Sequence, residues 1–168
     1  MIRVLGIDPG SRATGYGIID IAGVEGVYVD SGVIRVGDGP IPERLYAIHA
    51  ALGTIIDQYR PTVAAVESVF MRNNASSALK LGQARGVALC AAAAAGLPVS
   101  EYAPAAIKQA IVGRGRAEKA QIQHMVTALL KLPRQPAEDA ADALAAALCH
   151  CRTGATLERI GAAMEARP

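Results

Sequence analysis

The sequence predicts an α/β fold in which helices cover both faces of a mixed five-stranded sheet. Three strand-like segments follow one another at the start of the chain, which predicts an antiparallel meander. Two further strand-like segments then alternate with helical segments, the pattern that parallel strands produce. A chain of 168 residues with 52% hydrophobic residues can bury one core. We expect one domain over residues 1–153 and a loosely ordered tail over residues 154–168.

The first strand is predicted over residues 2–8, because a nearly continuous apolar run ends there at a carboxylate, Asp8. The Pro9-Gly10 pair after it predicts a type II turn, in which glycine takes the positive φ of the second central position. The chain then returns as a second strand. Gly15 and Gly17 share one face of this strand, where the missing Cβ lets another backbone or a phosphate come close.

The remaining elements follow from apolar periodicity and from the positions of glycine and proline. A third strand is expected over 24–36, with a bulge or bend at 30–32. Two more strands are expected, over 63–67 and 97–102. Helices are expected over 41–58, 76–95, 104–112, 117–130 and 137–151, with a basic loop at 113–116. The helical run 87–95 has no charged residue, so we expect a second surface, such as another subunit, to cover the side that the sheet leaves open.

Composition narrows the class of protein. No apolar run reaches the roughly 18 residues that a membrane span needs, so we expect a soluble, cytoplasmic protein. The cysteines are odd in number, three, and lie in apolar helical surroundings, which predicts a reducing compartment without disulfides. Cys149-His150-Cys151 suggests zinc, but residues two apart on a helix point away from each other and no second Cys or His pair completes the site.

Four carboxylates occupy positions that would meet at one edge of the predicted sheet. Asp8 and Glu67 each end a buried strand, and the sites of such folds collect at the carboxyl ends of parallel strands. Asp139 and Asp142 lie three residues apart, so a helix places them on one face. Acids in the first turn of a helix also complement its dipole, which by itself accounts for Glu138 and Asp139.

The helix dipole accounts less well for Asp142, which lies one turn further into the helix among alanines. Two carboxylates about 5 Å apart repel by about 3 kcal/mol at an effective dielectric constant of about 20. This exceeds the stabilisation of about 0.3 to 1 kcal/mol that the dipole provides, unless a cation lies between them. An all-oxygen set matches Mg²⁺, with Mn²⁺ as a substitute, and two such ions in one site can hydrolyse a phosphodiester.

Five blocks of the sequence together resemble the RuvC family of bacterial Holliday junction resolvases, in the order and at the spacing of that family. The blocks are Gly6-Ile7-Asp8-Pro9-Gly10-Ser11 with Thr14-Gly15-Tyr16-Gly17, Ala65-Val66-Glu67-Ser68-Val69-Phe70, 78–86, Ala117-Glu118-Lys119-Ala120-Gln121, and 138–145. The resemblance covers residues 1–151. It implies a ribonuclease H-like nuclease domain, a homodimer, and symmetric Mg²⁺-dependent nicking of four-way DNA junctions in recombination and repair.

The resemblance also implies roles for particular residues. Asp8, Glu67, Asp139 and Asp142 would be the metal-binding tetrad, and Lys108 and Lys119 would lie near the scissile phosphate, where they offset charge in the transition state. It further suggests a partner complex for branch migration, made of RuvA and RuvB type proteins.

Basic and aromatic residues give candidate DNA contacts. Lys108, Arg114, Arg116 and Lys119 oppose only Glu118, so they form either a DNA phosphate track or an ordinary solvated surface. Weaker candidates for backbone contacts are Arg72, Lys80 and Arg85. Phe70 would either pack on the helix that follows it or stack on an unpaired base at the junction centre, and the resemblance favours stacking.

Three other functions compete with junction cleavage. A different ribonuclease H-like nuclease, acting on an RNA-DNA hybrid or another substrate, is the nearest alternative. Asp8, Gly10 and Gly15 also resemble the phosphate hairpin of actin-like ATPases and sugar kinases, but those proteins need two lobes and 168 residues supply one. A junction-binding protein without catalysis would gain nothing from four acids placed near phosphates.

Overall fold

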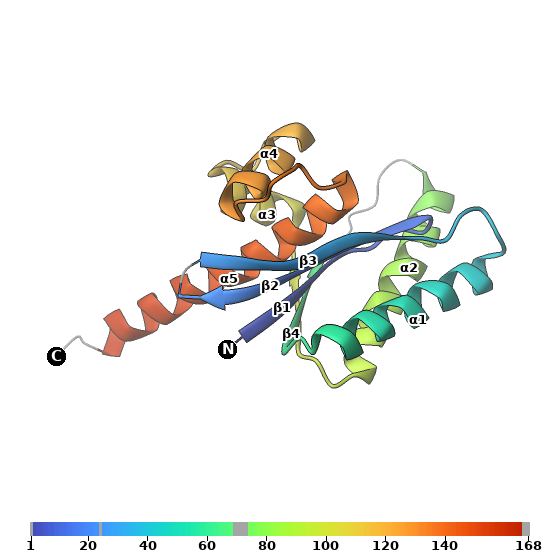
Figure 1. Cartoon of the computed structure of the whole chain (residues 1–168), viewed down its shortest axis with the longest axis horizontal. Coiled ribbons are helices and arrows are strands. Elements are labelled where there is room, and N and C mark those ends of the chain that lie inside the picture. The colour runs from blue at the N-terminus through green and yellow to red at the C-terminus, as the bar shows by residue number, and fades with distance from the viewer. Residues whose placement is uncertain (1, 24, 69–73, 166–168) are drawn as a thin grey trace.

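The computed structural model describes residues 2–23, 25–68 and 74–165, and the predicted mixed α/β architecture is confirmed (Figure 1). The strands are β1 (Ile2–Asp8), β2 (Ala13–Ala22), β3 (Glu25–Arg35), β4 (Val63–Glu67) and β5 (Val99–Tyr102). The helices are α1 (Ile41–Tyr59), α2 (Ala75–Ala94), α3 (Pro104–Val112), α4 (Lys119–Leu129) and α5 (Glu138–Glu165). Each of these elements was expected from the sequence, with shifts of a few residues at most of the ends.

The sheet has the strand order β3-β2-β1-β4-β5, with β1 at its centre. The first three strands are antiparallel neighbours, whereas β1, β4 and β5 run parallel. Ile7 pairs with Val66 in the parallel register, so the next residue on each strand is a carboxylate. Asp8 and Glu67 therefore end neighbouring strands at the same edge of the sheet.

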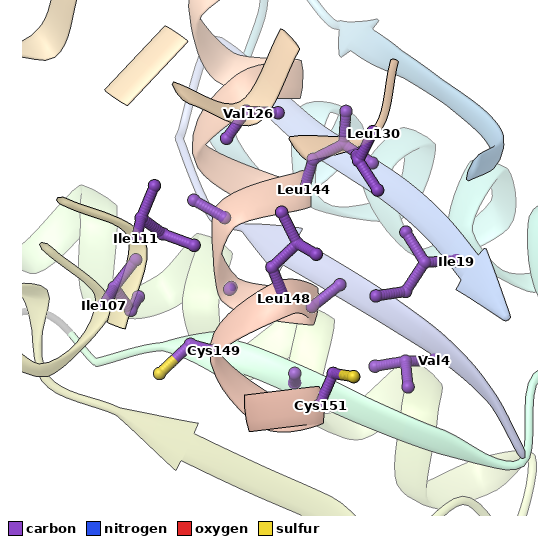
Figure 2. Close-up of a cluster of buried hydrophobic side chains, with 14 of the residues drawn as sticks. Val4, Ile19, Ile107, Ile111, Val126, Leu130, Leu144, Leu148, Cys149 and Cys151 are labelled. Carbon is purple, nitrogen blue, oxygen red and sulfur yellow. The ribbon is translucent and has the colours of Figure 1, made fainter. Parts of the chain in front are cut away.

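The two faces of the sheet carry different helices. Leu5 belongs to the core packed against α1 and α2, whereas Val4 belongs to the core built with α3, α4 and α5, shown in Figure 2. Ala65 of β4 also faces this second core. Because side chains alternate along a strand, Asp8 and Glu67 fall on the same face as Val4 and Ala65. Both strand-end carboxylates thus face the side of the sheet that α5 covers.

Helix α5 lies directly on the sheet because glycines leave room for it. A Cβ added to Gly15 would lie 1.9 Å from the carbonyl oxygen of Asp139, and one added to Gly17 would lie 2.7 Å from the Leu144 side chain. Of the two partners that the sequence allowed for this glycine face, a backbone or a phosphate, the structure has the backbone of α5. Since Gly15 pairs with Asp8 across β1 and β2, the first turn of α5 lies beside Asp8.

Two local predictions were inaccurate. Gly10 does not take a positive φ, so the turn after β1 is not the predicted type II turn. Glycine is needed there for another reason, because a Cβ at Gly10 would lie 2.0 Å from the carbonyl oxygen of Ala13. The bulge in β3 falls at Val29 rather than at 30–32, since Ile18 pairs with Asp30 while Ile19 pairs with Tyr28.

Helix α5 continues past the end at residue 151 that the sequence predicted, and runs to Glu165. No proline interrupts residues 137–165, and Gly154 and Gly161 cost a helix only about 1 kcal/mol each. Helix α2 is covered on one side only. Ala88, Ala91 and Ala92 are buried, whereas Cys90, Ala93 and Ala94 are exposed. In the described part of the chain, no helix is long and apolar enough to cross a membrane.

Candidate active site

The fold brings the four predicted carboxylates to one region at the carboxyl ends of β1 and β4. Asp8 and Glu67 end adjacent strands, near enough for the charge of Glu67 to raise the pKa of Asp8. Asp139 lies in the first turn of α5, whose backbone rests on Gly15 opposite Asp8. Asp142 lies one turn further along α5 and lines the same cleft as Glu67. Residues 8, 67, 139 and 142, up to 134 positions apart in the chain, therefore form one acidic cluster, which we call the tetrad.

Asp8 is the electrostatic centre of the tetrad. Burial raises the pKa of its carboxyl, and the negative charges of Glu67, Asp142 and Asp139 raise it further, to about 8. Only Lys119 acts in the opposite direction among the causes of this shift. The shift means that four carboxylates cannot all be ionised near neutral pH without a compensating positive charge.

The other members of the tetrad have the same tendency. Burial raises the pKa of Glu67, and the charge of Asp142 adds to this effect. Burial also raises the pKa of Asp142. The ammonium groups of Lys108 and Lys119 lower the pKa of both carboxyls, so the two predicted catalytic lysines act on the site although they come from α3 and from the start of α4.

The donor chemistry of the tetrad fits hard divalent cations. All its side chains offer carboxylate oxygen, which Mg²⁺ and Mn²⁺ prefer, and their mutual repulsion would be relieved by positive charge. Among the residues that the structure describes, no three His, Cys, Asp or Glu side chains close around a common point. The structure therefore provides a set of carboxylate ligands and an excess of negative charge that a bound cation would neutralise.

A cleft of about 780 Å³ opens beside the tetrad. Glu67 and Asp142 line it together with Lys108 and Lys119, so acidic and basic side chains face the same space. Asn74, the N-cap of α2, and residues of this helix also line the cleft, among them Ser77, Leu81 and Arg85. A cleft with carboxylates on one side and ammonium groups next to them suits a phosphodiester, which needs both cations and hydrogen-bond donors.

The predicted basic residues divide into paired and unpaired groups. Lys119 donates from Nζ to Glu138, and this hydrogen bond raises the pKa of Lys119. The guanidinium of Arg85 forms an ion pair with Glu101 of β5. Lys80 on α2 is exposed, as are Arg114 and Arg116 in the loop between α3 and α4. Lys80, Arg114 and Arg116 belong to no ion pair within the described residues. Their charges are therefore available to a polyanion.

Some predictions concern residues of other kinds. Phe70 and Arg72 lie outside the described residues, so both remain predictions. The Cys149-His150-Cys151 stretch belongs to the core rather than to the acidic cluster: the two sulfurs point to opposite sides of α5 (Figure 2), and His150 Nδ1 lies 2.8 Å from the hydroxyl of Tyr102.

Sequence reasoning missed the role of Glu138, which it explained by the helix dipole alone. Glu138 accepts the hydrogen bond of Lys119 and so holds that ammonium group near the tetrad. Sequence reasoning also missed Arg44, a charged residue buried on the inner face of α1. Its signal was present, because Arg44 precedes Ile48 by four residues and therefore lies on the apolar stripe of the helix.

Known proteins resemble this chain over nearly its whole length. The family model described as crossover junction endodeoxyribonuclease RuvC matches residues 4–150. A protein of that name from Alkalilimnicola ehrlichii is 56% identical over 165 residues, which cover 96% of this chain and 100% of the relative. Another from Shewanella frigidimarina is 53% identical over 167 residues, covering 99% and 96% of the two chains.

Solved structures agree with the sequence comparisons. The structure of Thermus thermophilus RuvC superposes with a TM-score of 0.83 at 35% identity, covering 95% of this chain and 97% of that one. T. thermophilus RuvC in complex with Holliday junction substrate gives a TM-score of 0.84 at 35% identity, covering 92% and 98%. These matches confirm the ribonuclease H-like α/β fold that the sequence resemblance implied.

Proposed function

The chain belongs to the RuvC family of crossover junction endodeoxyribonucleases, and we propose that it resolves four-way DNA junctions by hydrolysing phosphodiester bonds at the tetrad. The observation that carries the proposal is a cluster of four interacting carboxylates, of which Glu67 and Asp142 line a cleft together with two lysines. A second copy of this arrangement in a dimer would cut the symmetry-related strand, so that the two nicks leave ligatable duplexes.

Asp8, Glu67, Asp139 and Asp142 would hold the divalent cations, for which we propose two Mg²⁺ ions. Such ions activate a water and stabilise the leaving oxygen of a phosphodiester when they are bound. Repulsion within the tetrad supports this role, since the ions supply the positive charge that the pKa of Asp8 shows to be needed. Mn²⁺ has the same preference for oxygen ligands and should substitute for Mg²⁺.

The lysines would act on the phosphate itself. Lys108 and Lys119 lie near enough to Glu67 and Asp142 to lower the pKa of both carboxyls, so a phosphate bound at the tetrad would lie within reach of their ammonium groups. There they would offset the charge that builds up on the phosphate oxygens in the transition state. Glu138 would orient Lys119, because it accepts the hydrogen bond of its Nζ.

The exposed cations would bind the arms of the junction. Arg114 and Arg116 extend the basic character of the cleft beyond Lys108 and Lys119, and Lys80 does so on the side of α2. Contacts of this kind fix the DNA by its phosphates and do not read its sequence. We propose further that Arg72 contributes a phosphate contact and that Phe70 stacks on an unpaired base at the junction centre.

We propose that the protein acts as a homodimer joined through the outer face of α2. Resolution needs matched nicks in two strands of like polarity, and one active site per chain supplies them only if a two-fold axis relates two chains. The uncharged run 87–95 keeps Cys90, Ala93 and Ala94 exposed, so this apolar surface is open to a second copy. Association with RuvA and RuvB type proteins is proposed from family membership alone.

The dimer is tested by one exposed substitution and a matched control. Ala94→Glu places a charge on the proposed interface, whereas Ala120→Glu places the same charge on an exposed position of α4, on the other face of the sheet. Sedimentation without DNA should give a monomer for Ala94→Glu and a dimer for Ala120→Glu. A wild-type protein that stays monomeric on its junction contradicts the proposal. Ala92 is unsuitable for this test because it is buried within its own chain.

The activity is tested on three substrates of equal length: a four-way junction, a linear DNA duplex and an RNA-DNA hybrid, each with Mg²⁺. We expect paired, symmetric nicks in the junction and little cleavage of the other two. Preferential cleavage of the hybrid would support the ribonuclease H alternative instead. Asp142→Asn should cut none of the substrates, and Asp20→Asn, at the opposite end of β1 from the tetrad, should cut the junction like the wild type.

A further inference from the structure

Two buried polar side chains contact the same turn behind the tetrad. Within the residues that the structure describes, Thr14 and Arg44 are the polar or charged residues in the buried class, with 0% and 8% of their surface exposed. Thr14 belongs to β2 and Arg44 to α1, yet both bind residues 10–11. This turn directly follows Asp8, so the two side chains act on the main chain that carries the most strongly perturbed carboxylate.

Thr14 closes the turn from the side of β2. Its Oγ1 donates to the carbonyl oxygen of Gly10 at 2.9 Å and accepts from the Gly10 N–H at 3.3 Å. No Cβ fits at Gly10, because it would lie 2.0 Å from the carbonyl oxygen of Ala13. One hydroxyl therefore satisfies both backbone groups of Gly10 in a turn that is too tight for any other residue.

Arg44 closes the turn from the opposite side. Its Nε donates to the carbonyl oxygen of Ser11 at 2.9 Å, and its Nη2 donates to the same oxygen. Arg44 forms no ion pair with a carboxylate in the described part of the chain. Burying a guanidinium without a counter-charge lowers the stability of the fold, because the charge loses its hydration. An apolar residue on the inner face of α1 would avoid this loss. We therefore attribute the presence of a buried arginine at position 44 to its hydrogen bonds with the Ser11 carbonyl oxygen.

Further bonds fix the same segment at its outer end. The N–H of Val36 donates to the carbonyl oxygen of Arg12 at 3.0 Å, and the Arg12 side chain pairs with Asp38 at 2.8 Å. The Arg44 guanidinium bonds the carbonyl oxygen of Ser11, three residues after Asp8, so it reaches Asp8 through the backbone of the turn.

We propose that Arg44 and Thr14 are positioning residues that hold the main chain at Asp8 in place against the repulsion of the other carboxylates, and thereby set the affinity of the tetrad for divalent cations. This inference rests on the proposed function, because it takes the tetrad to be the cation site. Residues that orient metal ligands from behind typically change metal affinity or activity by about 10- to 100-fold when they are replaced.

The test measures Mn²⁺ binding directly, by the loss of the electron paramagnetic resonance signal of free Mn²⁺ on titration with protein. Arg44→Met keeps much of the side-chain volume and removes the donors, and Thr14→Val removes only the hydroxyl. Each should weaken Mn²⁺ binding by roughly 10-fold or more. Arg44→Lys retains one donor for the Ser11 carbonyl and should recover part of the affinity. Junction binding measured in EDTA should not change, because the exposed cations carry it.

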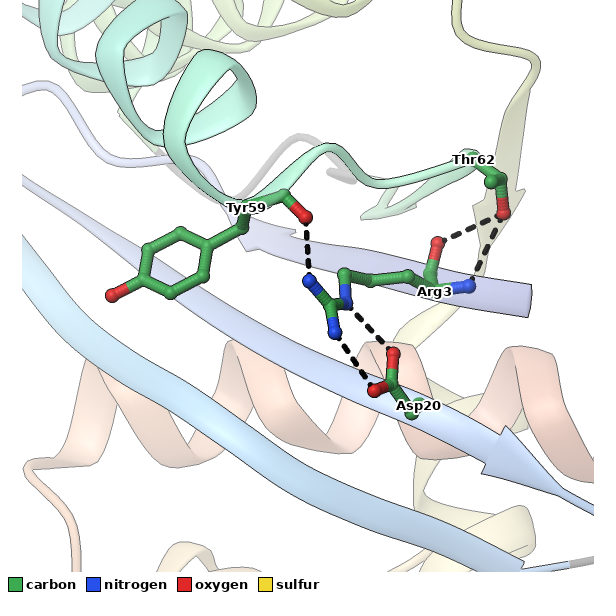
Figure 3. A network of polar contacts seen from close by, with 4 residues as sticks. All are labelled: Arg3, Asp20, Tyr59 and Thr62. Atoms are coloured by element: carbon green, nitrogen blue, oxygen red, sulfur yellow. Dashed lines mark hydrogen bonds and ion pairs between the residues drawn. The ribbon is translucent and has the colours of Figure 1, made fainter. Parts of the chain in front are cut away.

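The matched control is Arg3→Met, at the other end of β1. Arg3 is partly buried, and its side chain makes three hydrogen bonds, two to Asp20 and one to the carbonyl oxygen of Tyr59 (Figure 3). Its loss should lower the unfolding temperature and leave Mn²⁺ affinity unchanged. The same Mn²⁺ affinity in folded Arg44→Met and wild type, or an equal weakening in Arg3→Met, overturns the inference.

Two other outcomes are also informative. If Arg44→Met does not fold, Thr14→Val and Arg44→Lys decide the question by the same titration. If the wild type itself binds no Mn²⁺ at the tetrad, measured against Asp8→Asn, the proposed function fails and the positioning role fails with it. A wild type that binds Mn²⁺ while all three variants bind equally well overturns the positioning role alone.

Discussion

The two ends of β1 place an aspartate in opposite electrostatic surroundings. At the amino end, Arg3 donates to both carboxylate oxygens of Asp20, at 2.7 and 2.9 Å, and to the carbonyl oxygen of Tyr59 at 2.7 Å (Figure 3). At the carboxyl end, Asp8 faces three other carboxylates. The hydrogen bonds of Arg3 lower the pKa of Asp20, whereas burial and like charge raise the pKa of Asp8 to about 8.

This difference separates a stabilising use of charge from a functional one. Arg3 and Asp20 connect β1, β2 and the end of α1 with matched charges, which favours the folded state. The tetrad concentrates like charges that disfavour the folded state until a cation binds. A site that is destabilising by itself is what a cation-dependent enzyme requires, since the same repulsion becomes binding energy for the ions.

The largest effect is expected from the carboxyl end. Asp8→Asn, Glu67→Gln, Asp139→Asn and Asp142→Asn should each reduce junction cleavage by about 1,000-fold or more, because each removes a ligand and its charge. Junction affinity in EDTA should stay near that of the wild type. Single-turnover cleavage with Mg²⁺ measures the first effect and a mobility-shift titration the second. A variant that keeps near-normal cleavage removes its residue from the tetrad.

A smaller effect is expected from the lysines that offset the charge of the tetrad. Lys108→Ala and Lys119→Ala should lower the single-turnover rate by about 10- to 100-fold at saturating protein, with less effect on affinity. Glu138→Gln should give a weaker version of the Lys119→Ala defect, because it loosens Lys119 without removing it. Unchanged rates together with weaker binding would show that both lysines are ordinary phosphate contacts.

The smallest effect is expected from Glu101, which pairs with Arg85 on the wall of the cleft. If Arg85 contacts the DNA backbone as predicted, Glu101 competes with a phosphate for its guanidinium. Glu101→Gln should then tighten junction binding by about 2- to 5-fold at low salt, since a phosphate contact contributes mainly through charge. Arg85→Gln should abolish this gain. If the Glu101→Gln/Arg85→Gln double variant still bound the junction more tightly, the gain would come from the net charge of the protein and not from Arg85.

The strands, the helices and the four carboxylates of the tetrad could be predicted from the sequence because their signals are local. Asp8 and Glu67 were found as carboxylates that end apolar runs, and Asp139 and Asp142 as a pair with helical spacing. Both patterns are set by strand and helix periodicity within a few residues. The faces of the sheet follow from the same periodicity, so the side on which the tetrad forms was predictable once α5 was placed.

The rest depends on contacts between distant segments. Arg44 lies 33 residues from the Ser11 carbonyl that it holds, so no local pattern names its partner. The conformation of Gly10 was mispredicted because Thr14 and Ala13, rather than the Pro-Gly pair, determine the turn. Glu138 looked like a helix-dipole residue until α4 placed Lys119 beside it. Sequence periodicity does not encode such partners, since they depend on how the elements pack.

Repulsion within the tetrad should destabilise the metal-free fold, and thermal unfolding of metal-free Asp8→Asn and Asp20→Asn at pH 8.5 measures this effect directly. Asp8 has a folded-state pKa of about 8 against an ordinary value of 3.8, so the folded state holds a proton that the unfolded chain has lost. The free energy of unfolding therefore falls as pH rises from about 3.8 to about 8. Above that pH, the ionised Asp8 carboxylate destabilises the folded state in full. Asp20 has a lowered pKa, so its contribution is fully present at pH 8.5.

We predict that Asp8→Asn unfolds at a higher temperature than the wild type at pH 8.5. Its free energy of unfolding should exceed that of the wild type by on the order of a few kcal/mol. Asp20→Asn should unfold at a lower temperature. The advantage of Asp8→Asn should shrink at pH 5.5, and adding Mn²⁺ should raise the unfolding temperature of the wild type more than that of Asp8→Asn. If metal-free Asp8→Asn unfolds at or below the wild-type temperature at pH 8.5, the repulsion on which this account rests is absent.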